Sequence, residues 1–350
     1  MNIQTIFKST AVVAALMAAG YATNVKAYAV ADFYSGKSIS LIIGYGAGGG
    51  YDTYSRVLAR HLGNHIPGKP TIVPKNMPGA GAVKAANFIF NATPKNGTNL
   101  GVFASSAAMD PLFSGKKSKA KFQPEKFTWI GNMNKETFTC GVWKSSGIKT
   151  FDEMIKKGIT FGSTGPAAIT SQHPRTFNSL AGTKIKIIYG YKGTKGVNLA
   201  MRQGEVGGSC GLSKSTIMSR WYKDIKKGDL KIIVQMGVKK DPYFGDAAHI
   251  FDYAKNDGAR KAMKAIFGRD ILGRPLAASP GIPADRAKAL RKAFVDTMND
   301  PVFLADAKKT RITINYHSGA EVDKLIAGFL ATPADAIAMA KKALARPKKK

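Results

Sequence analysis

Three glycine-containing turns in the chain come directly before predicted helices, at residues 46–51, 163–167 and 190–193. The first N–H groups of a helix have no intrahelical partner, and the helix dipole gives this end about half a unit of positive charge. Such a turn can therefore receive a carboxylate through its backbone, without a titrating side chain. Two or three of these turns facing one another across a cleft would hold a small organic acid.

The first turn also matches the G-x-G-x-x-G pattern of dinucleotide-binding folds, through Gly44, Gly46 and Gly49. That fold needs an acidic residue about 20 positions later, which binds the ribose hydroxyls. The sequence has no Asp or Glu between Asp52 and Asp110. The pattern therefore does not predict a nucleotide site, and no other cofactor is expected.

A second pattern, at residues 207–211, matches the G-x-S-x-G turn that presents the nucleophilic serine of many hydrolases, through Gly207, Ser209 and Gly211. This turn needs a buried strand before the serine, and an acid and a histidine later in the chain. Asp246 and His317 supply those residue types in that order. A secreted serine hydrolase is therefore an alternative function, although only two residues separate the preceding predicted helix from the first glycine.

His61 and His65 are four positions apart on the predicted helix at residues 52–65, a spacing that permits shared metal binding. No third ligand follows them nearby in the sequence. We therefore expect both histidines to face solvent, and we predict no metal site.

Cys140 and Cys210 are the only two cysteines, too few for a disulfide scaffold or a four-thiolate zinc site. Export from the cytoplasm would allow a disulfide between them. Spacing alone does not say whether their segments are neighbours, and two buried free thiols are equally compatible with the sequence. The sequence leaves the Cys140–Cys210 bond open.

The N-terminus is typical of a secretory signal peptide over residues 1–29. Lys8 gives a positively charged start, residues 11–19 form a short apolar core, and small residues allow cleavage after Ala27 or Ala29. The apolar run is shorter than the ~20 residues that a membrane-spanning helix needs. We therefore expect an exported, periplasmic protein.

The composition is that of a basic globular protein. Of 350 residues, 53 are Lys or Arg and 22 are Asp or Glu, and the formal net charge is +31. Removal of the signal peptide leaves 51 bases and 22 acids, so the charge becomes +29. A surface this positive attracts anionic solutes and lipids, whereas nucleic acid is not an expected partner outside the cytoplasm. The sequence does not explain why the charge is so high.

Short apolar runs alternate with amphipathic helical segments, which is typical of an α/β fold with doubly wound, mostly parallel sheets. The predicted strands are at residues 40–44, 71–73, 100–103, 138–143, 159–162, 185–189, 206–210, 230–236 and 271–277. The last third of the chain has too few strands for a sheet of its own, so it is expected to complete the first one. This predicts a two-lobed protein whose chain crosses between lobes twice. Lobe 1 is expected at residues 30–128 and 245–350, and lobe 2 at residues 129–244.

Residues 38–62 resemble the solute-binding receptors of tripartite tricarboxylate transporters. In that family a strand is followed by a turn of the type P-G-G-G-x-D and then by a helix. Residues 48–50 and Asp52 match the turn, while Ala47 stands where proline is usual. The resemblance continues at residues 76–81, 94–97, 191–193, 204–206 and 278–283, and so covers nearly the whole exported chain.

The resemblance implies a periplasmic binding protein of the second topological class, with no enzymatic activity. Such a receptor, expected to be a monomer, holds a carboxylate between its lobes. It delivers that solute to large and small integral membrane subunits of a secondary transporter. By similarity the ligand-binding residues are Tyr45, Gly48, Gly49, Gly50, Tyr51, Asp52, Ala104, Ser105, Ser106, Thr164, Gly165 and Tyr191.

The sequence departs from the family at two places. The turn at residues 162–174 is longer than usual, and residues 207–211 replace a segment in which an aspartate is common. Both lie where ligand side groups would be recognised, so the identity of the carboxylate stays open. Asp52 either caps the first helix, the role we favour, or accepts a hydrogen bond from the ligand. A membrane sensor is an alternative partner to a transporter.

Overall fold

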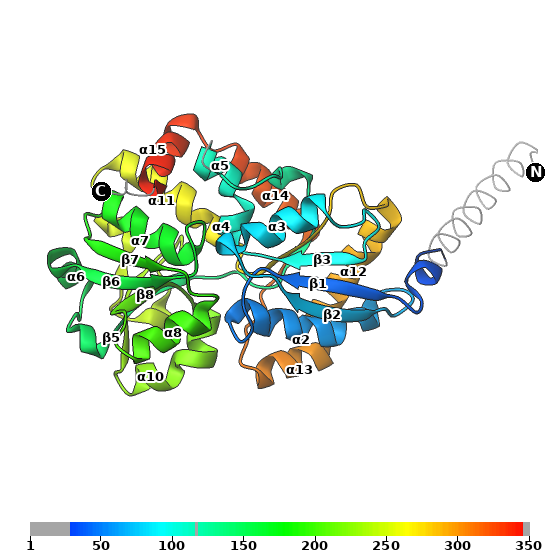
Figure 1. The fold of residues 1–350 in the computed structure, drawn as a ribbon, viewed down its shortest axis with the longest axis horizontal. Coiled ribbons are helices and arrows are strands. Elements are labelled where there is room, and N and C mark those ends of the chain that lie inside the picture. Colours follow the sequence, from blue (N-terminus) through cyan, green and yellow to red (C-terminus); the bar gives the residue numbers. More distant parts are fainter. Residues whose placement is uncertain (1–28, 116–117, 346–350) are drawn as a thin grey trace, which may run out of the picture.

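The computed structural model of the chain describes residues 29–115 and 118–345. It contains two six-stranded sheets, each covered by helices, which lie side by side as two lobes (Figure 1). The predicted signal peptide, apart from residue 29, lies outside the described residues. The α/β class and the two-lobed architecture predicted from the sequence are confirmed.

The first sheet has the strand order β12-β4-β11-β3-β1-β2. β1 runs parallel to β2 and β3, whereas β11 runs antiparallel between β3 and β4. The carboxyl ends of β1 and β3 therefore meet at one edge, where ligand sites of open α/β sheets are found. The strands are β1 (Ser38–Ile43), β2 (Thr71–Asn76), β3 (Asn99–Val102), β4 (Thr128–Asn132), β11 (Pro275–Ala278) and β12 (His317–Ser318).

The second sheet has the order β10-β9-β5-β8-β6-β7. Only β5 runs against the other strands of this sheet, so the sheet is mostly parallel. Its strands are β5 (Phe138–Trp143), β6 (Ile159–Ser163), β7 (Ile185–Tyr189), β8 (Gly208–Ser213), β9 (Leu230–Gln235) and β10 (Ala248–His249).

Helices connect and cover these strands. They are α2 (Gly50–His65), α3 (Val83–Asn91), α4 (Ser105–Ala108), α5 (Asp110–Ser114), α6 (Phe151–Lys157), α7 (Ile169–Leu180), α8 (Thr194–Arg202), α9 (Lys214–Thr216), α10 (Tyr222–Lys226), α11 (Asp257–Gly268), α12 (Ala284–Asn299), α13 (Pro301–Lys309), α14 (Gly319–Leu330) and α15 (Ala334–Leu344). Two single turns also matter below, η1 (Ala80–Ala82) and η8 (Arg269–Ile271). No helix of the described chain combines the length and apolarity that a membrane span requires.

The chain passes from the first sheet to the second between β4 and β5, and returns between β10 and β11. The two crossings run side by side: Met133 N–H donates to the carbonyl of Arg274 at 3.1 Å, and Gly273 N–H donates to the carbonyl of Asn134 at 3.0 Å. The last helix, α15, packs against α11 and α7 as well as α5. We propose that the chain passes from one lobe to the other within residues 133–137 and 250–274. The lobe boundaries at 128/129 and 244/245 stay predictions.

The expectation that His61 and His65 face solvent is wrong. Helix α13 packs against α2, and His61 Nε2 lies 2.8 Å from Asp306 Oδ2 while His65 Nε2 lies 2.9 Å from Asp300 Oδ2. Each histidine is thus paired with an aspartate about 240 positions later in the chain. Within the described residues, no group of three His, Cys, Asp or Glu side chains is arranged to hold a metal ion.

Cys140 and Cys210 form a disulfide, with an S–S distance of 1.99 Å. They lie opposite each other on the neighbouring antiparallel strands β5 and β8, and both are fully buried. The bond links positions 70 residues apart, at the centre of the second sheet. Closing so long a loop removes much conformational freedom from the unfolded chain.

We expect the double variant Cys140→Ala/Cys210→Ala to lose about 2–4 kcal/mol of the free energy of unfolding, because its unfolded chain is no longer cross-linked. Urea denaturation followed by circular dichroism measures the loss. A reductant should lower the wild-type midpoint and leave that of the variant unchanged. Equal midpoints for oxidised and fully reduced wild type would contradict this account.

Candidate ligand-binding site

The first glycine turn leads from the carboxyl end of β1 into α2, and Asp52 holds it in place. Gly48 has a φ of +80°, a conformation that favours glycine. Its N–H donates to Asp52 Oδ2 at 2.8 Å, while Arg56 Nε and Asn76 Nδ2 each donate to Oδ1 at 2.9 Å. Both carboxylate oxygens of Asp52 are therefore used within lobe 1. Asp52 lies in the first turn of α2 and binds the N–H of the residue before the N-cap, Gly49, so it fixes the turn and no side chain caps the helix.

The charge of Asp52 is stabilised where it stands. Burial raises the pKa of Asp52, but hydrogen bonds from Arg56, from the N–H of Gly48 and from Asn76 outweigh this effect, so the pKa lies below its ordinary value. The carboxylate is thus ionised at neutral pH, and its negative charge interacts favourably with the positive end of the α2 dipole. Its role is to shape the turn.

The first turn touches lobe 2 directly. Gly46 N–H donates to the carbonyl of Lys192 at 3.2 Å. A Cβ atom added to Gly49 would lie 2.9 Å from Thr194 Oγ1, and one added to Gly50 would lie 2.7 Å from Thr216 Oγ1. The absence of side chains is therefore what allows the start of α2 to approach the start of α8 and the end of α9.

A second pair of turns meets beside the first. A Cβ atom added to Gly81, in η1 of lobe 1, would lie 2.4 Å from the backbone nitrogen of Ala168, which caps α7. One added to Gly165 would lie 3.0 Å from the backbone nitrogen of Gly81. Thr164 lies in the same turn, where its N–H donates to Thr170 Oγ1 at 3.1 Å. The predicted turns at 46–51 and 163–167 thus belong to one interface between the lobes.

Two aromatic rings cover this interface from the lobe 1 side. Tyr45 and Tyr51 stack with their ring centres 4.6 Å apart, and the Tyr45 hydroxyl donates to the carbonyl of Gly81 at 3.4 Å. Burial raises the pKa of both tyrosines, against the opposing charge of Arg274. Both hydroxyls therefore stay protonated, and that of Tyr51 makes no hydrogen bond within the described chain.

Residues 104–106 form the start of the short helix α4, at the carboxyl end of β3, and all three are buried. Ser105 Oγ donates to Asp270 Oδ1 at 3.4 Å, and the same carboxylate is 2.7 Å from Nε2 of the buried His173 on α7. Ser106 Oγ has no hydrogen-bond partner among the described residues. The predicted serine turn therefore reaches the second lobe through Asp270.

Tyr191 lies apart from these contacts. Its hydroxyl donates to Glu205 within lobe 2, and its ring packs against the apolar cluster that contains Val197 and Val206. Burial, followed by the bond to Glu205, raises the pKa of Tyr191 to about 12. Its neighbours Lys192 and Thr194 make the interlobe contacts through the backbone and a short side chain. A ligand contact by Tyr191 stays a prediction.

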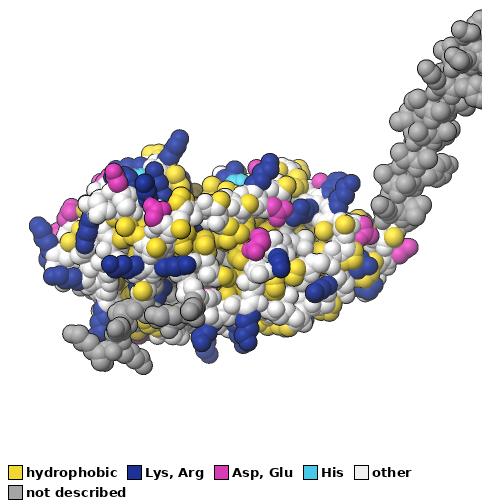
Figure 2. Space-filling view, turned by 90° about the horizontal axis from the view of Figure 1, so that it is seen from above, with side chains coloured by type: hydrophobic (Ala, Val, Ile, Leu, Met, Phe, Trp, Pro, Cys, Tyr) yellow, Lys and Arg dark blue, Asp and Glu magenta, His cyan; other side chains and the backbone are white. Residues whose placement is uncertain are grey.

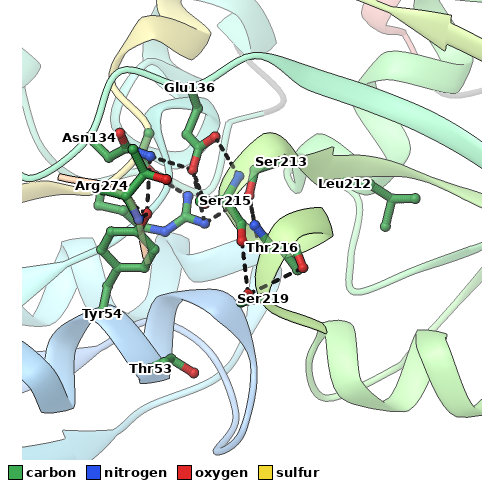
Figure 3. A network of polar contacts seen from close by, with 12 residues as sticks. Thr53, Tyr54, Asn134, Glu136, Leu212, Ser213, Ser215, Thr216, Ser219 and Arg274 are labelled. Atoms are coloured by element: carbon green, nitrogen blue, oxygen red, sulfur yellow. Dashed lines mark hydrogen bonds and ion pairs between the residues drawn. The ribbon is translucent and has the colours of Figure 1, made fainter. Parts of the chain in front are cut away.

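A buried ion pair that no sequence pattern predicts lies at the centre of the interface (Figure 3). Arg274, on the second crossing, lies 3.7 Å from Glu136, on the first crossing, and both side chains are almost completely buried. The guanidinium is sandwiched against the rings of Tyr51 and Tyr54, 4.5 and 4.8 Å from their centres. It also donates to Ser213 Oγ at 3.0 Å. One side chain thus connects both lobes and both crossings.

Glu136 is held by several donors in the same network. Asn134 Nδ2 donates to its carboxylate at 2.7 Å, and the Ser215 hydroxyl donates to the same oxygen. Burial raises the pKa of the Glu136 carboxyl, while Arg274, Ser215 and Asn134 oppose the rise, and the pKa remains above its ordinary value. The ionised state of Glu136 therefore depends on these partners, Arg274 first.

A second buried arginine lies on the α4 side. Arg269, in η8, stacks over the ring of Phe113 with a distance of 4.7 Å and donates to the side-chain oxygen of Gln172 on α7. Its Nε and Nη1 atoms have no hydrogen-bond partner within the described residues. Burial lowers the pKa of Arg269 to about 10, against the charges of Asp270 and Asp110, so the guanidinium is charged at neutral pH.

Ser209 is not placed as a nucleophile. It lies inside β8, is buried, and donates to the carbonyls of Cys210 at 3.0 Å and Gly162 at 3.4 Å. The two later residues of the proposed triad are elsewhere: Asp246 is 87% exposed in its ion pair with Lys231, and His317 lies in the first sheet. The serine hydrolase alternative is therefore wrong.

Outside the interface, basic side chains are widely distributed. Figure 2 shows Lys and Arg scattered over the visible face among fewer acidic groups, without a single dominant patch. A diffuse charge of this kind raises the local concentration of anions around the molecule, and salt screens it over about 10 Å.

Comparisons with known proteins agree with this architecture. A family model described as "Tripartite tricarboxylate transporter family receptor" matches residues 55–339. A Cupriavidus necator protein described as "UPF0065 protein in gbd 5'region" is 31% identical over 245 residues, which cover 68% of this chain and 71% of that protein.

Solved structures share the fold at low sequence identity. The periplasmic binding protein BugD is 18% identical with a TM-score of 0.69, over 89% of this chain and 98% of that one. MatC from Rhodopseudomonas palustris, with bound malate, is 15% identical with a TM-score of 0.69, over 89% and 99%. Another R. palustris protein, with adipate, is 14% identical with a TM-score of 0.67, over 87% and 97%.

We expect Gly49→Val to hold the lobes apart while leaving each lobe folded. The φ and ψ of Gly49, −85° and 175°, suit a β-branched residue, and the steric conflict is with Thr194 of the other lobe. Small-angle X-ray scattering should give a larger radius of gyration than for wild type. The matched control is Gly328→Val on α14, where an added Cβ meets nothing within 4 Å. Identical scattering from all three proteins would count against the contact.

We expect Arg274→Met to destabilise the protein by about 3–5 kcal/mol at neutral pH, because it leaves a buried carboxylate without its counter-ion. The pKa of Glu136 should rise further. A folded state that holds a proton which the unfolded state has lost becomes less stable as pH rises. The free energy of unfolding should therefore fall more steeply with pH than in wild type, from about pH 4.3 upward.

Urea denaturation between pH 4 and pH 8 measures this dependence. The matched variant is Arg274→Met/Glu136→Gln, which has no carboxyl to titrate and should recover most of the loss and the extra slope. If the double variant kept the steep pH dependence, Glu136 would not be the group responsible.

Proposed function

The chain belongs to the tripartite tricarboxylate transporter receptor family, and on that basis we propose that it binds a small organic carboxylate between its lobes. Members of this family are periplasmic solute-binding receptors and not enzymes. The ligand would be carried to the large and small integral membrane subunits of a secondary transporter. Residues 1–29 would direct export, and the receptor would act as a monomer.

The observation that carries the proposal is the meeting of two helix-initiating turns from opposite lobes. The turn before α2 contacts the turn before α8, through Gly46 and the carbonyl of Lys192, and η1 of lobe 1 contacts the turn before α7, through Gly81, Gly165 and Ala168. Their N–H groups give a partial positive charge in a place that closure shields from water, and this strengthens the attraction for an anion.

The side chains around these turns add donors rather than acceptors. The hydroxyls of Tyr51 and Ser106 and two nitrogens of Arg269 are buried without a hydrogen-bond partner in the described chain. Buried donors are normally satisfied. A ligand with several acceptor oxygens, such as a di- or hydroxycarboxylate, would satisfy them, in keeping with the malate and adipate bound to similar structures.

The proposed ligand set is the first turn from Tyr45 to Asp52, the serines of α4, and Thr164 and Gly165. Within it Asp52 acts indirectly, because both of its oxygens are bound to Gly48, Arg56 and Asn76. The lobes must part at the crossings to admit a ligand, as in other two-lobed binding proteins. Delivery to a sensor would use the same capture step and differ only in the membrane partner.

Isothermal titration calorimetry tests the capture step. Malate, adipate and citrate are titrated into wild type, Gly49→Val and Gly328→Val, with succinamide as an uncharged counterpart. We expect one saturable carboxylate site in wild type and Gly328→Val, a loss of at least about tenfold in affinity in Gly49→Val, and no binding of the diamide. Equal binding of succinamide and the acids, or unchanged affinity in Gly49→Val, would contradict the proposal.

A further inference from the structure

A second hollow lies beside the two crossings and does not involve the glycine turns. It has a volume of about 730 Å³ and is lined by residues 134–137 of the first crossing, by Lys214, Ser215 and Met218 after β8, by residues 236–242 after β9, and by Phe267, Ile271, Thr313 and Asn315. This size is within the range of small-molecule sites, which is about 300–1,000 Å³. None of the ligand-binding residues predicted from the sequence lines it. We call it the hinge crevice.

The charge of the hinge crevice is positive. Four lysines line it, Lys135, Lys214, Lys239 and Lys240. Lys214 pairs with Asp241 at 2.8 Å, and the carboxylate of Glu136 on the inner wall is matched by Arg274. Within the described chain the other three lysines form no salt bridge. Three lysine ammonium groups in one hollow are thus without a salt bridge in the described chain.

The crevice also has an apolar surface. Met218 and Val238 line it, and they are among the exposed large apolar side chains, Val238 at 65%. Their surroundings include the buried Met236. Covering such side chains with an apolar group is worth about 25 cal/mol per Å² of surface removed from water. A hydrated inorganic ion would leave them exposed, whereas an anion with a hydrocarbon body would cover them.

We propose that the hinge crevice is a second ligand site, for a small organic anion with an apolar body, such as an aromatic or alkyl carboxylate or sulfonate. The anionic group lies among Lys135, Lys239 and Lys240, and the apolar body lies against Met218 and Val238. The site is separate from the interlobe carboxylate site, and it does not depend on the proposed function. Glu136 and Ser215 line the crevice and also bind the Arg274 network, so the two regions share a wall (Figure 3).

The test uses 8-anilinonaphthalene-1-sulfonate, a fluorescent aromatic sulfonate, with the full-length mature protein. We expect one equivalent to bind with increased emission. Lys135→Gln/Lys239→Gln/Lys240→Gln should weaken this binding by at least about tenfold. The control Lys84→Gln/Lys95→Gln/Lys149→Gln removes the same charge from exposed lysines elsewhere and should bind the probe as wild type does.

Three further measurements identify the site. Val238→Ser should weaken binding of the probe although all lysines are in place. Benzoate should displace the probe from wild type, whereas inorganic phosphate at equal concentration should not. Gly49→Val should retain probe binding, which separates this site from the interlobe one. Equal weakening in both triple variants would show adsorption governed by net charge and overturn the proposal. Displacement by phosphate as effective as by benzoate, or loss of binding in Gly49→Val alone, would overturn it as well.

Discussion

The close approach of two backbones across the lobe interface is the constraint on which this structure depends. Gly46 reaches the carbonyl of Lys192, and Gly81 lies so close to Ala168 that a methyl group could not fit between them. A side chain at Gly81 would hold the two backbones apart, and a Cβ atom at Gly46 would lie 3.1 Å from the carbonyl oxygen of Lys192, a tight contact. Electrostatic attraction between a helix terminus and an anion falls rapidly with distance and with access of water. Glycine at these positions therefore determines how closely the start of α2 can approach that of α8, and how closely η1 can approach the start of α7.

The Arg274 network extends this constraint to the crossings. A buried ion pair adds little net stability, because its desolvation cost offsets its Coulombic gain. Its effect is on geometry: the guanidinium is held by Glu136 on the first crossing, by the lobe 1 rings of Tyr51 and Tyr54, and by the hydroxyl of Ser213 in lobe 2. Parting the lobes would break the bond between Arg274 and Ser213. The network therefore favours one closed arrangement and connects the interlobe site to the segments that must bend.

Local patterns predicted most of the strands and the glycine turns, because periodicity and turn chemistry depend on neighbouring residues. They missed β4, β10 and β12. The expectations that failed or stayed open involve distant partners. The spacing of His61 and His65 does not reveal their partners, because Asp306 and Asp300 lie about 240 positions later in the chain. Pairing of Cys140 with Cys210 depends on the order of strands in the second sheet. Arg274 and Glu136 lie in unremarkable segments, and only the fold brings the two crossings side by side. Ser209 matched a motif whose strand-to-helix turn is missing here.

The closed interface also limits which donors a ligand can use. Gly46 N–H is already bound to Lys192, and the Asp52 carboxylate is saturated within its own lobe. Among the described residues, buried donors without a hydrogen-bond partner include the Tyr51 and Ser106 hydroxyls and nitrogens of Arg269 and Arg274, from the start of α2 to the side of α4. A ligand shifts the equilibrium between open and closed lobes only by the difference in its affinity for the two states. Acceptor groups of a ligand would bind these buried donors when the two lobes are closed around it. On the proposed function, recognition of the ligand's side groups would therefore be concentrated toward α4 and η8, while the glycine turns would supply an attraction common to carboxylates.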